Sequence, residues 1–148
     1  MLTQVLLHVL GYDIWFYVSH RLLHTRTFWW IHARHHEKVT NLRWLDAYHG
    51  HWLETTVQGA GFFLPVLFGY WNWWVAALTA FAINARGLAR HDTRIAWLIG
   101  DHHLQHHRSP KGNYGEPWLD ALCGTRQSQQ AGPPAPRTCS ASASDRMS

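Results

Sequence analysis

Eight of the thirteen histidines fall into three short motifs whose residue type and spacing are typical of metal ligands. One motif is H-x-x-x-H, and the other two, far apart in the chain, share the pattern H-x-x-H-H. Side chains three or four positions apart lie on one face of an α-helix, so the histidines of each motif are expected to point together. The predicted ligands are His20, His24, His32, His35, His36, His103, His106 and His107. Three such motifs in one chain indicate a ligand set.

The number of imidazoles indicates more than one metal ion, because a zinc ion takes only three or four ligands. Neutral imidazole binds iron, zinc, copper and nickel, so the ligand type alone does not choose the metal. The sequence has no E-x-x-H motif of the kind found in soluble di-iron bundles. The carboxylates expected near the motifs are Glu37, Asp92 and Asp101, and neither Cys123 nor Cys139 lies in a C-x-x-C motif. We therefore expect an imidazole site for two metals.

The composition is that of a protein in contact with a membrane. Hydrophobic residues make up 47% and charged residues 15% of the 148 residues, whereas about 25% is charged in an ordinary soluble domain. The ten tryptophans are as suited to aromatic belts at a membrane interface as to a core. The formal net charge of +4 is too small and too scattered to indicate a nucleic-acid partner.

The first apolar region is expected to form a helix that leads into the first histidine motif. Residues 2–18 carry a single charged residue, Asp13. As a helix this region would be about 25 Å long, just short of the roughly 30 Å hydrocarbon core of a bilayer. The region lacks the positive start and cleavage site of a signal peptide. We therefore expect one N-terminal membrane helix.

A second apolar region is expected to form a helical hairpin. Residues 55–85 carry no charged side chain. This region of thirty-one residues is longer than one membrane-spanning helix needs. Pro65 and residues 69–72 are turn signals near the middle of this region. The sequence therefore predicts one helix over 51–68 and a second over 73–89.

Basic residues gather in the two polar segments that contain the histidine motifs. Five of the thirteen Lys and Arg residues lie in 19–54 and six lie in 86–126. One crossing followed by a returning hairpin places both segments on the same side of the membrane, and the positive-inside rule makes that side cytoplasmic. The expected fold is an all-α integral membrane protein. It has one N-terminal membrane helix, a helical hairpin and a helical cap of histidine motifs on the cytoplasmic face.

The chain is expected to form one domain followed by a tail. Residues 110–115 have the composition of a loop, and residues 116–122 are expected to form a short helix. After Thr125 the sequence becomes a low-complexity stretch rich in Gln, Pro, Ala and Ser. The predicted organisation is a membrane domain over 1–126 and a disordered tail over 127–148.

The three histidine motifs resemble those of the fatty acid hydroxylase/sterol desaturase superfamily, and the resemblance covers about 12–125. Supporting features surround the motifs. They are Asp13 seven residues before the first motif, H-W-L-E at 51–54, N-Y-G-x-x-W-L-D at 113–120 and the pair Gly124–Thr125. Together these features are highly specific, so the chain is identified as a member of this superfamily of histidine-motif membrane enzymes.

The resemblance implies a function, a cofactor and partners. Members are integral membrane oxygenases with two iron ions, so we expect O₂-dependent hydroxylation or desaturation of a membrane lipid such as a sterol or fatty acyl chain. The electron donor would be a protein such as cytochrome b5 or an NAD(P)H-dependent reductase. The expected location is the endoplasmic reticulum in a eukaryote or the cytoplasmic membrane in a bacterium. The resemblance also makes His91 a ninth metal ligand, and the H-x-x-x-H spacing favours a sterol-oxidising member.

The chain departs from the family pattern in two respects. Many members have a histidine four residues before the position of His91, where this chain has Gly87, and Asn84 is a weak substitute. Members also usually have more membrane helix before the first motif. Two alternatives therefore stay open: a membrane metal-binding protein that is not redox active, and a truncated, inactive relative.

The remaining polar residues have weaker claims to a role. Asp13 is either a polar residue on the packed side of its helix or a carboxylate that orients a histidine. His51 is expected at the membrane interface or behind a ligand, and His8 is expected to pack within the first apolar region. His49 and His102 are expected to lie beside the site. The residues expected to form apolar walls around the substrate are Phe62, Phe63 and Trp73.

Overall fold

The computed structural model describes residues 1–127, and this part of the chain forms helices and loops without a strand. The expected all-α class is therefore confirmed. The α-helices are α1 (Leu2–Leu23), α2 (Trp29–His32), α3 (Trp52–Gly59), α4 (Trp73–Arg90), α5 (Ala96–Ile99), α6 (His102–Arg108) and α7 (Pro117–Leu122). The 3-10 helices are η1 (Ala33–His36), η2 (Trp44–Tyr48), η3 (Ala60–Phe68) and η4 (Thr93–Ile95).

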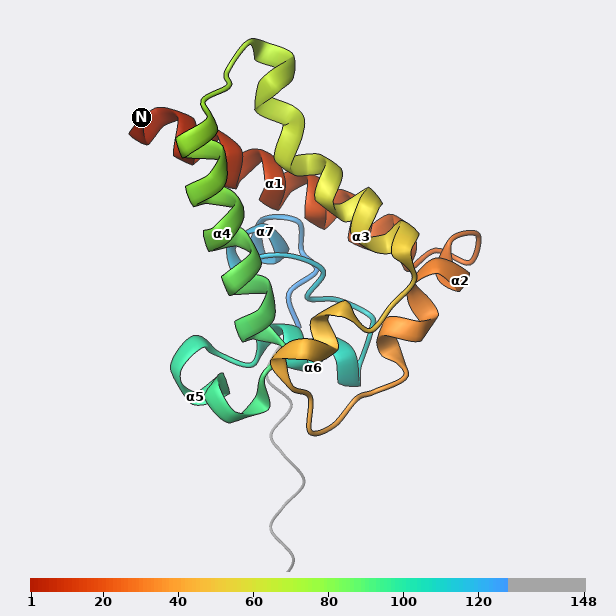
Figure 1. The fold of residues 1–148 in the computed structure, drawn as a ribbon. Helices are drawn as coiled ribbons and strands as arrows, with labels where there is room; N and C mark the ends of the chain where they lie inside the picture. Colours follow the sequence, from red (N-terminus) through yellow and green to blue (C-terminus); the bar gives the residue numbers. More distant parts are fainter. Residues whose placement is uncertain (128–148) are drawn as a thin grey trace, which may run out of the picture.

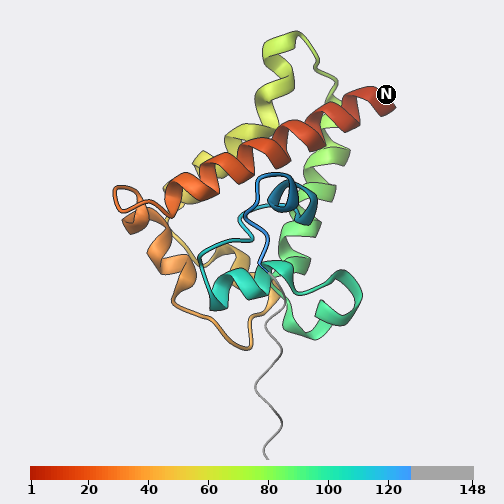
Figure 2. The same ribbon diagram turned by 180° about the vertical axis from the view of Figure 1, so that it is seen from behind.

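Helix α1 passes behind the hairpin in Figure 1 and in front of it in Figure 2. It continues beyond the apolar run into the first histidine motif, as expected, and ends at Leu23, so His20 lies in its last turn and His24 follows its end. One face is buried and includes polar side chains, while the opposite face exposes an apolar residue at every fourth position. The exposed residues of this row are Leu2, Leu6, Leu10, Ile14, Val18 and Leu22.

The expected hairpin is present, although its first arm is not one regular α-helix. This arm begins as α3 and continues without a break as the 3-10 helix η3, which contains Pro65 and ends at Gly69 with φ +77°. Proline has no N–H to donate, and glycine adopts a positive φ at little cost, so both residues suit the end of this arm. Helix α4 then returns, capped by the Asn72 side chain. No helix within residues 1–127 has both the length and the apolar character that a bilayer crossing requires.

Close packing between α1 and the first arm depends on Gly61. A Cβ atom at this position would lie 2.5 Å from the Trp15 Cβ, which is closer than packed atoms approach. The indole Nε1 of Trp15 donates a hydrogen bond to the Val57 carbonyl at 2.6 Å. The small residue and the tryptophan together hold α1 and the hairpin arm in contact.

The centre of the molecule is a polar site more than an apolar core. Among residues 1–127, fifteen buried residues are polar or charged, against nine buried hydrophobic ones. Buried polar groups are costly unless they find partners, so such a centre indicates a functional site. The nine hydrophobic residues are Tyr17, Leu23, Ile31, Leu42, Val75, Ala76, Ile83, Leu104 and Leu119. Both views show α6 and α7 on the same side of α1, where they close over this centre (Figures 1 and 2).

Gln127, the first residue of the expected tail, contacts the loop that follows α6. Its backbone N–H donates to Asn113 Oδ1 at 2.8 Å and its side chain donates to the Ser109 carbonyl at 2.8 Å. The rest of the expected tail lies outside the described residues.

Candidate metal centre

Nine histidines gather into two clusters, and in each cluster one ring nitrogen from every member lies within 4.8 Å of those of the others. The first cluster contains His20, His24, His32, His36 and His106. The second cluster contains His35, His91, His103 and His107. The structure thus brings together all eight motif histidines and His91. Their role as metal ligands stays a prediction.

The first H-x-x-H-H motif is divided between the clusters. His32 and His36 belong to the first cluster, and His35 belongs to the second. His35 and His36 are successive residues of the 3-10 helix η1, in which side chains point roughly 120° apart, so they face different clusters. The expectation that the histidines of this motif would point together was therefore wrong, whereas His20 and His24 share a cluster as expected. The motif instead lies between two sites and contributes to both.

The second H-x-x-H-H motif, on α6, is divided in the opposite sense. His103 and His107 belong to the second cluster, and His106 belongs to the first. Each cluster therefore receives two histidines from one motif and one from the other. The first cluster is completed by two histidines at the end of α1, whereas the second receives only His91 from the end of α4.

Ring nitrogens converge at the centre of the first cluster. His32 Nε2 lies 2.9 Å from His20 Nε2 and 3.0 Å from His36 Nε2. His24 Nε2 lies 3.0 Å from His106 Nε2 and 3.3 Å from His20 Nε2. All five imidazoles therefore present the same ring atom to one small volume.

Backbone carbonyls fix the tautomer of two of these rings. His20 Nδ1 donates to the Tyr114 carbonyl at 2.5 Å, and His106 Nδ1 donates to the Gly112 carbonyl at 2.6 Å. A carbonyl oxygen can only accept, so Nδ1 carries the proton and a neutral ring has its lone pair on Nε2. Both rings are therefore held with Nε2 free to bind a metal.

The second cluster is built in the same way around His91. Its Nε2 lies 3.1 Å from His35 Nε2 and 3.0 Å from His103 Nε2, and its Nδ1 donates to the Gly87 carbonyl at 2.8 Å. Both ring nitrogens of His107 are buried without a hydrogen-bond partner among the described residues. A buried imidazole in this state has a lone pair available for a ligand that the protein itself does not supply.

Burial keeps the clustered histidines neutral, which is the form that binds metals. It lowers the pKa of His24 and His35 to about 3, and that of His91 and His106 to about 4. Neutral imidazoles whose lone pairs face one another at about 3 Å repel unless a proton or a cation lies between them. The donor set therefore fits two metal ions, and imidazole donors suit iron among others.

Glu54, on α3, is a carboxylate at the site to which the sequence reasoning gave no role. It is 5% exposed, and its Oε1 lies 3.1 Å from His32 Nδ1 and 3.5 Å from His35 Nδ1. Burial raises the pKa of Glu54 to about 8. Its position in the H-W-L-E motif, directly before the thirty-one uncharged residues, is the sequence signal that singles it out.

The three carboxylates that were expected near the motifs serve other purposes. Glu37 contacts His49 Nε2 at 3.1 Å, Asp92 pairs with Arg94 at 2.5 Å, and Asp101 accepts a hydrogen bond from a glutamine of α6 at 2.8 Å. Within residues 1–127, no hydrogen bond or ion pair joins any of them to a clustered histidine. His49 thus lies near the site without joining it.

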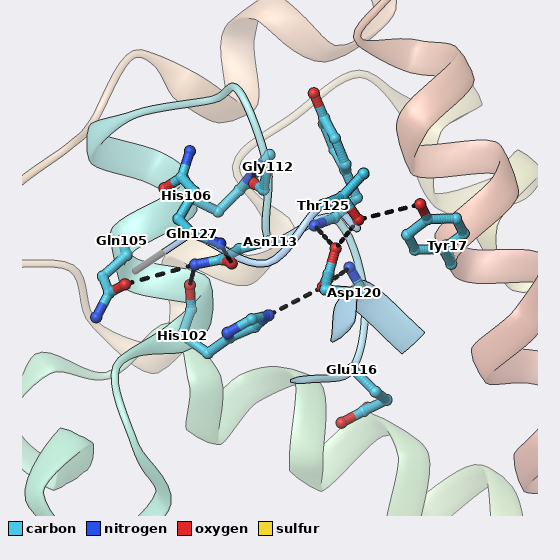
Figure 3. A network of polar contacts seen from close by, with 12 residues as sticks. Tyr17, His102, Gln105, His106, Gly112, Asn113, Glu116, Asp120, Thr125 and Gln127 are labelled. Carbon is cyan, nitrogen blue, oxygen red and sulfur yellow. Dashed lines mark hydrogen bonds and ion pairs between the residues drawn. The ribbon is translucent and has the colours of Figure 1, made fainter. Parts of the chain in front are cut away.

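Asp120 organises the loop that supplies the two carbonyl acceptors of the first cluster (Figure 3). Its carboxylate accepts hydrogen bonds from the backbone N–H groups of Tyr114 and Gly115, both at 2.9 Å. It also accepts from Thr125 Oγ1 at 2.7 Å and from His102 Nε2 at 2.9 Å. Burial raises the pKa of Asp120, but these hydrogen bonds, led by that from His102, outweigh burial and hold it below its usual value.

Asn113 gives the same loop its turn. It is fully buried and has φ +57°, a left-handed conformation that asparagine adopts more readily than most residues. Its side-chain Nδ2 donates to the His102 carbonyl at 3.1 Å, and its backbone N–H donates to the Thr125 carbonyl at 2.9 Å (Figure 3). The loop is thereby tied to both α6 and the residues after α7. His102, expected beside the site, is a support for this loop.

Asp13 pairs with an arginine, so of its two expected roles the structure supports a polar residue on the packed side of its helix and not a carboxylate that orients a histidine. Its carboxylate accepts from both terminal nitrogens of Arg86, with an Oδ2–Nη1 distance of 3.2 Å, and Arg86 also lies 3.0 Å from Glu116. Seven residues separate Asp13 from His20, which is about 10 Å along a helix and too far for contact. His8 packs as expected, fully buried with Nδ1 donating to the Phe62 carbonyl at 3.0 Å.

His51 caps α3 and does not support a clustered histidine directly. Its Nδ1 accepts a hydrogen bond from the backbone N–H of Leu53 at 3.2 Å, and its ring stacks on Trp52 with 5.7 Å between centroids. A side-chain acceptor at the start of a helix satisfies an N–H group that has no partner in the helix. His51 therefore fixes the start of the helix that carries Glu54.

A pocket of about 340 Å³ connects both clusters with apolar side chains. The clustered histidines that line it are His20, His32, His35, His91 and His103. The apolar lining includes Phe16, Phe62, Phe63, Ile83 and Leu88. Two of the three expected wall residues are thus present. The prediction was wrong for Trp73, which is 76% exposed and lies edge-on against Trp71 outside the pocket.

Methylsterol-oxidising enzymes are among the relatives of this chain. It is 30% identical to the C-4 methylsterol oxidase erg25 of Schizosaccharomyces pombe over 86% of this chain and 48% of the relative. It is 31% identical to methylsterol monooxygenase 1 of Gallus gallus and 32% identical to that of Rattus norvegicus. These two alignments each cover 76% of this chain, and 42% and 43% of the relatives. The chain therefore spans less than half the length of these relatives. No solved structure matches it.

The family described as fatty acid hydroxylase matches residues 5–125, which include both histidine clusters, Glu54 and the loop held by Asp120. The match covers far more than half of the chain. It agrees with the resemblance indicated by the spacing of the histidine motifs. The chain therefore belongs to the fatty acid hydroxylase family.

Proposed function

We propose that this chain is an O₂-dependent di-iron oxidoreductase that hydroxylates a membrane lipid. The observation that carries this proposal is the pair of histidine clusters opening into one pocket with apolar walls. The nine clustered histidines would hold two iron ions, one in each cluster. When bound, the iron ions would supply the reduction of O₂ that an unactivated C–H bond requires.

The printed names of the relatives support a sterol as the lipid. They are described as a C-4 methylsterol oxidase and as methylsterol monooxygenases. A sterol is a rigid apolar skeleton with few polar groups, and the apolar side of the pocket suits such a ligand. We therefore propose hydroxylation of a methylsterol, ahead of desaturation or oxidation of a fatty acyl chain.

The reaction balances with two electrons from a partner. One C–H bond of the lipid is broken, one oxygen atom of O₂ becomes the new hydroxyl, and the other leaves as water with two protons. The residues of this chain hold the ligand imidazoles in one tautomer and place the lipid carbon beside them. Phe62 and Phe63 would exclude water from the reacting carbon, which limits side reactions.

A membrane supplies both the substrate and the location in this proposal. Large apolar side chains are exposed along the hairpin, including Trp74 at 82% and Phe81 at 73%. Exposed apolar surface of this kind is typical of proteins that bind membranes. We propose a membrane-bound protein with its histidine clusters on the cytoplasmic side. A cytochrome b5 or an NAD(P)H-dependent reductase would deliver the electrons.

The proposed function is tested by following oxygen from ¹⁸O₂ into lipid. The full chain, purified in detergent and loaded anaerobically with ferrous iron, is incubated with a methylsterol, a reductase and NADPH. We expect ¹⁸O in a new sterol hydroxyl and about two irons per chain. His35→Ala and His106→Ala should each abolish product, because each removes a ligand from a different cluster. His49→Ala, which alters a neighbour outside both clusters, should retain activity.

Two results would contradict the proposal. Product that forms without O₂, or whose new oxygen comes from water, would exclude an oxygenase. Tight binding of a single zinc ion that His106→Ala leaves unchanged would exclude the di-iron centre. Binding of two metals without any product, across sterols and acyl lipids, would favour a metal-binding protein that is not redox active.

A further inference from the structure

We propose that Glu54 is a positioning residue that orients one ligand of each cluster and thereby couples the two metal sites. The inference rests on the proposed role of the clusters as metal sites and assigns them a shared support. A residue that reaches both clusters can make the affinity of one site depend on the other.

The position of Glu54 between the clusters carries the proposal. Its Oε1 lies 3.1 Å from Nδ1 of His32, a member of the first cluster, and 3.5 Å from Nδ1 of His35, a member of the second. The two imidazole rings are stacked, with 5.1 Å between centroids and 16° between planes. Oε1 of Glu54 therefore faces the Nδ1 atom of both rings. The Nε2 atom of each ring is left to face its own cluster.

Other clustered histidines show what this contact would do. His20, His91 and His106 each donate from Nδ1 to a backbone carbonyl, which leaves Nε2 for the metal. His32 and His35 have no such hydrogen bond, and their Nδ1 atoms are buried without a partner of good geometry among the described residues. A carboxylate that accepts from Nδ1–H fixes the tautomer and raises the basicity of the ring. We infer that Glu54 Oε1, at 3.1 and 3.5 Å, would supply this acceptor to both rings.

The segment before Glu54 is built to hold its carboxylate in place. Gly50 has no Cβ, and a Cβ there would lie 2.6 Å from Glu54 Oε2. His51 caps the first turn of α3, on which Glu54 is carried. Glu54 Oε2 is itself buried without a partner among the described residues. A carboxylate kept this far from solvent is stabilised when cations bind on either side of it, because their charge offsets the cost of burial.

The test is a titration of the metal-free full chain with cobalt(II), followed by visible absorption, which yields two binding constants. In Glu54→Gln, which keeps the side-chain shape, we expect both constants to weaken by roughly 10- to 100-fold, the usual effect of losing such a support. Glu37→Gln is the matched control, because Glu37 is an exposed carboxylate that contacts a histidine outside the clusters. Its two constants should equal those of the wild type.

The outcomes separate this inference from the proposed function. A wild-type chain that binds no cobalt would refute the metal sites themselves. A wild-type chain that binds two ions, with Glu54→Gln weakening one constant or neither, would refute only the shared role of Glu54. Circular dichroism of each metal-free variant checks that its helices are retained.

A second measurement does not depend on metal binding or on the stability of a variant. In the metal-free wild type at about pH 9, above the pKa of about 8 that burial gives Glu54, ¹⁵N-histidine NMR should show a protonated Nδ1 on both His32 and His35. The His49 carbonyl is a competing acceptor that raises the pKa of His35, although burial outweighs it. His32 is therefore the decisive ring, because the His49 carbonyl could by itself keep a proton on His35 Nδ1. An unprotonated Nδ1 on either ring would overturn the proposal.

Discussion

Gly87 and His91 lie one turn apart at the end of α4, and the Gly87 carbonyl accepts a hydrogen bond from His91 Nδ1 at 2.8 Å. On α1 the equivalent spacing carries two histidines, His20 and His24, which both enter the first cluster. The two clusters therefore differ by one imidazole, and the difference falls at Gly87. Both Gly87 and His91 line the pocket, so a side chain at position 87 would lie between the pocket and the second cluster.

Gly87→His should complete the second cluster. A Cβ at this position meets no atom within 4 Å, and residues four apart share a helix face, so the new imidazole can approach the second cluster beside His91. We expect tighter metal binding by about tenfold or more at one site, measured by cobalt titration. Gly87→Ala is the control, because it removes the glycine and raises helix stability by up to about 1 kcal/mol, more than histidine does, without adding a ligand. Equal affinities in the two variants would contradict the prediction.

Asp120→Asn should weaken the first cluster more than the second. The carboxylate holds Tyr114 and Gly115 in place, and the Tyr114 carbonyl in turn orients His20. An amide nitrogen in place of one oxygen would face a donor, leaving a buried N–H unsatisfied at a cost of about 1–3 kcal/mol. Urea unfolding measures the loss of stability, and the cobalt titration should show one weakened constant. Two constants weakened equally would show that the loop does not act through the first cluster.

Much of this architecture could be predicted from local patterns. The turn signals at Pro65 and 69–72 mark the hairpin, and its second helix begins at Trp73 as expected and ends within one residue of the expected position. The three motifs indicated eight of the nine clustered histidines, because imidazoles at helical spacing on a polar segment have few other uses. His91 is a single histidine with no local pattern, and only the family resemblance indicated it.

The division of the clusters could not be read from spacing. The H-x-x-H-H pattern permits one site or two, and the choice depends on where α6 and η1 sit relative to each other. Glu54 was given no role for a similar reason. It lies seventeen positions after Glu37, the carboxylate that follows the motif directly, and its contact with His32 exists only in the folded chain. Asp13 shows the converse. A carboxylate two turns from a histidine suggested a partner on its own helix, but the partner is on α4.

The metal-free protein should lose stability as the pH falls below about 6.5. Burial lowers the pKa of His24 and His35 to about 3 and that of His91 and His106 to about 4, whereas an unfolded histidine has a pKa of about 6.5. Between these values the unfolded chain binds more protons than the folded one, so the free energy of unfolding decreases as the pH decreases. Each such histidine contributes at most about 1.4 kcal/mol per pH unit.

Chemical denaturation of the metal-free chain between pH 7.5 and 5 measures this slope. His91→Phe, which replaces one buried imidazole by an apolar ring, should reduce the slope without reversing its sign. The control His49→Phe removes a half-exposed histidine outside the clusters and should leave the slope nearly unchanged. A stability that is flat or rises as the pH falls would show that the clustered histidines titrate normally in the folded state.

Removing Arg86 should destabilise the protein more than removing Asp13. Arg86 lies between two acidic side chains, in contact with Asp13 and 3.0 Å from Glu116. Asp13→Ala leaves Arg86 paired with Glu116, so we expect a loss of about 1–3 kcal/mol, the range for removing one partner of a buried hydrogen bond. Arg86→Ala leaves Asp13, which is 4% exposed, without its cation, and an uncompensated buried charge costs about 3–5 kcal/mol. The free energy of unfolding measures both losses. The double variant, Asp13→Ala with Arg86→Ala, should be more stable than Arg86→Ala alone. The opposite order of the single variants, or losses that simply add in the double variant, would show that Asp13 and Arg86 act independently.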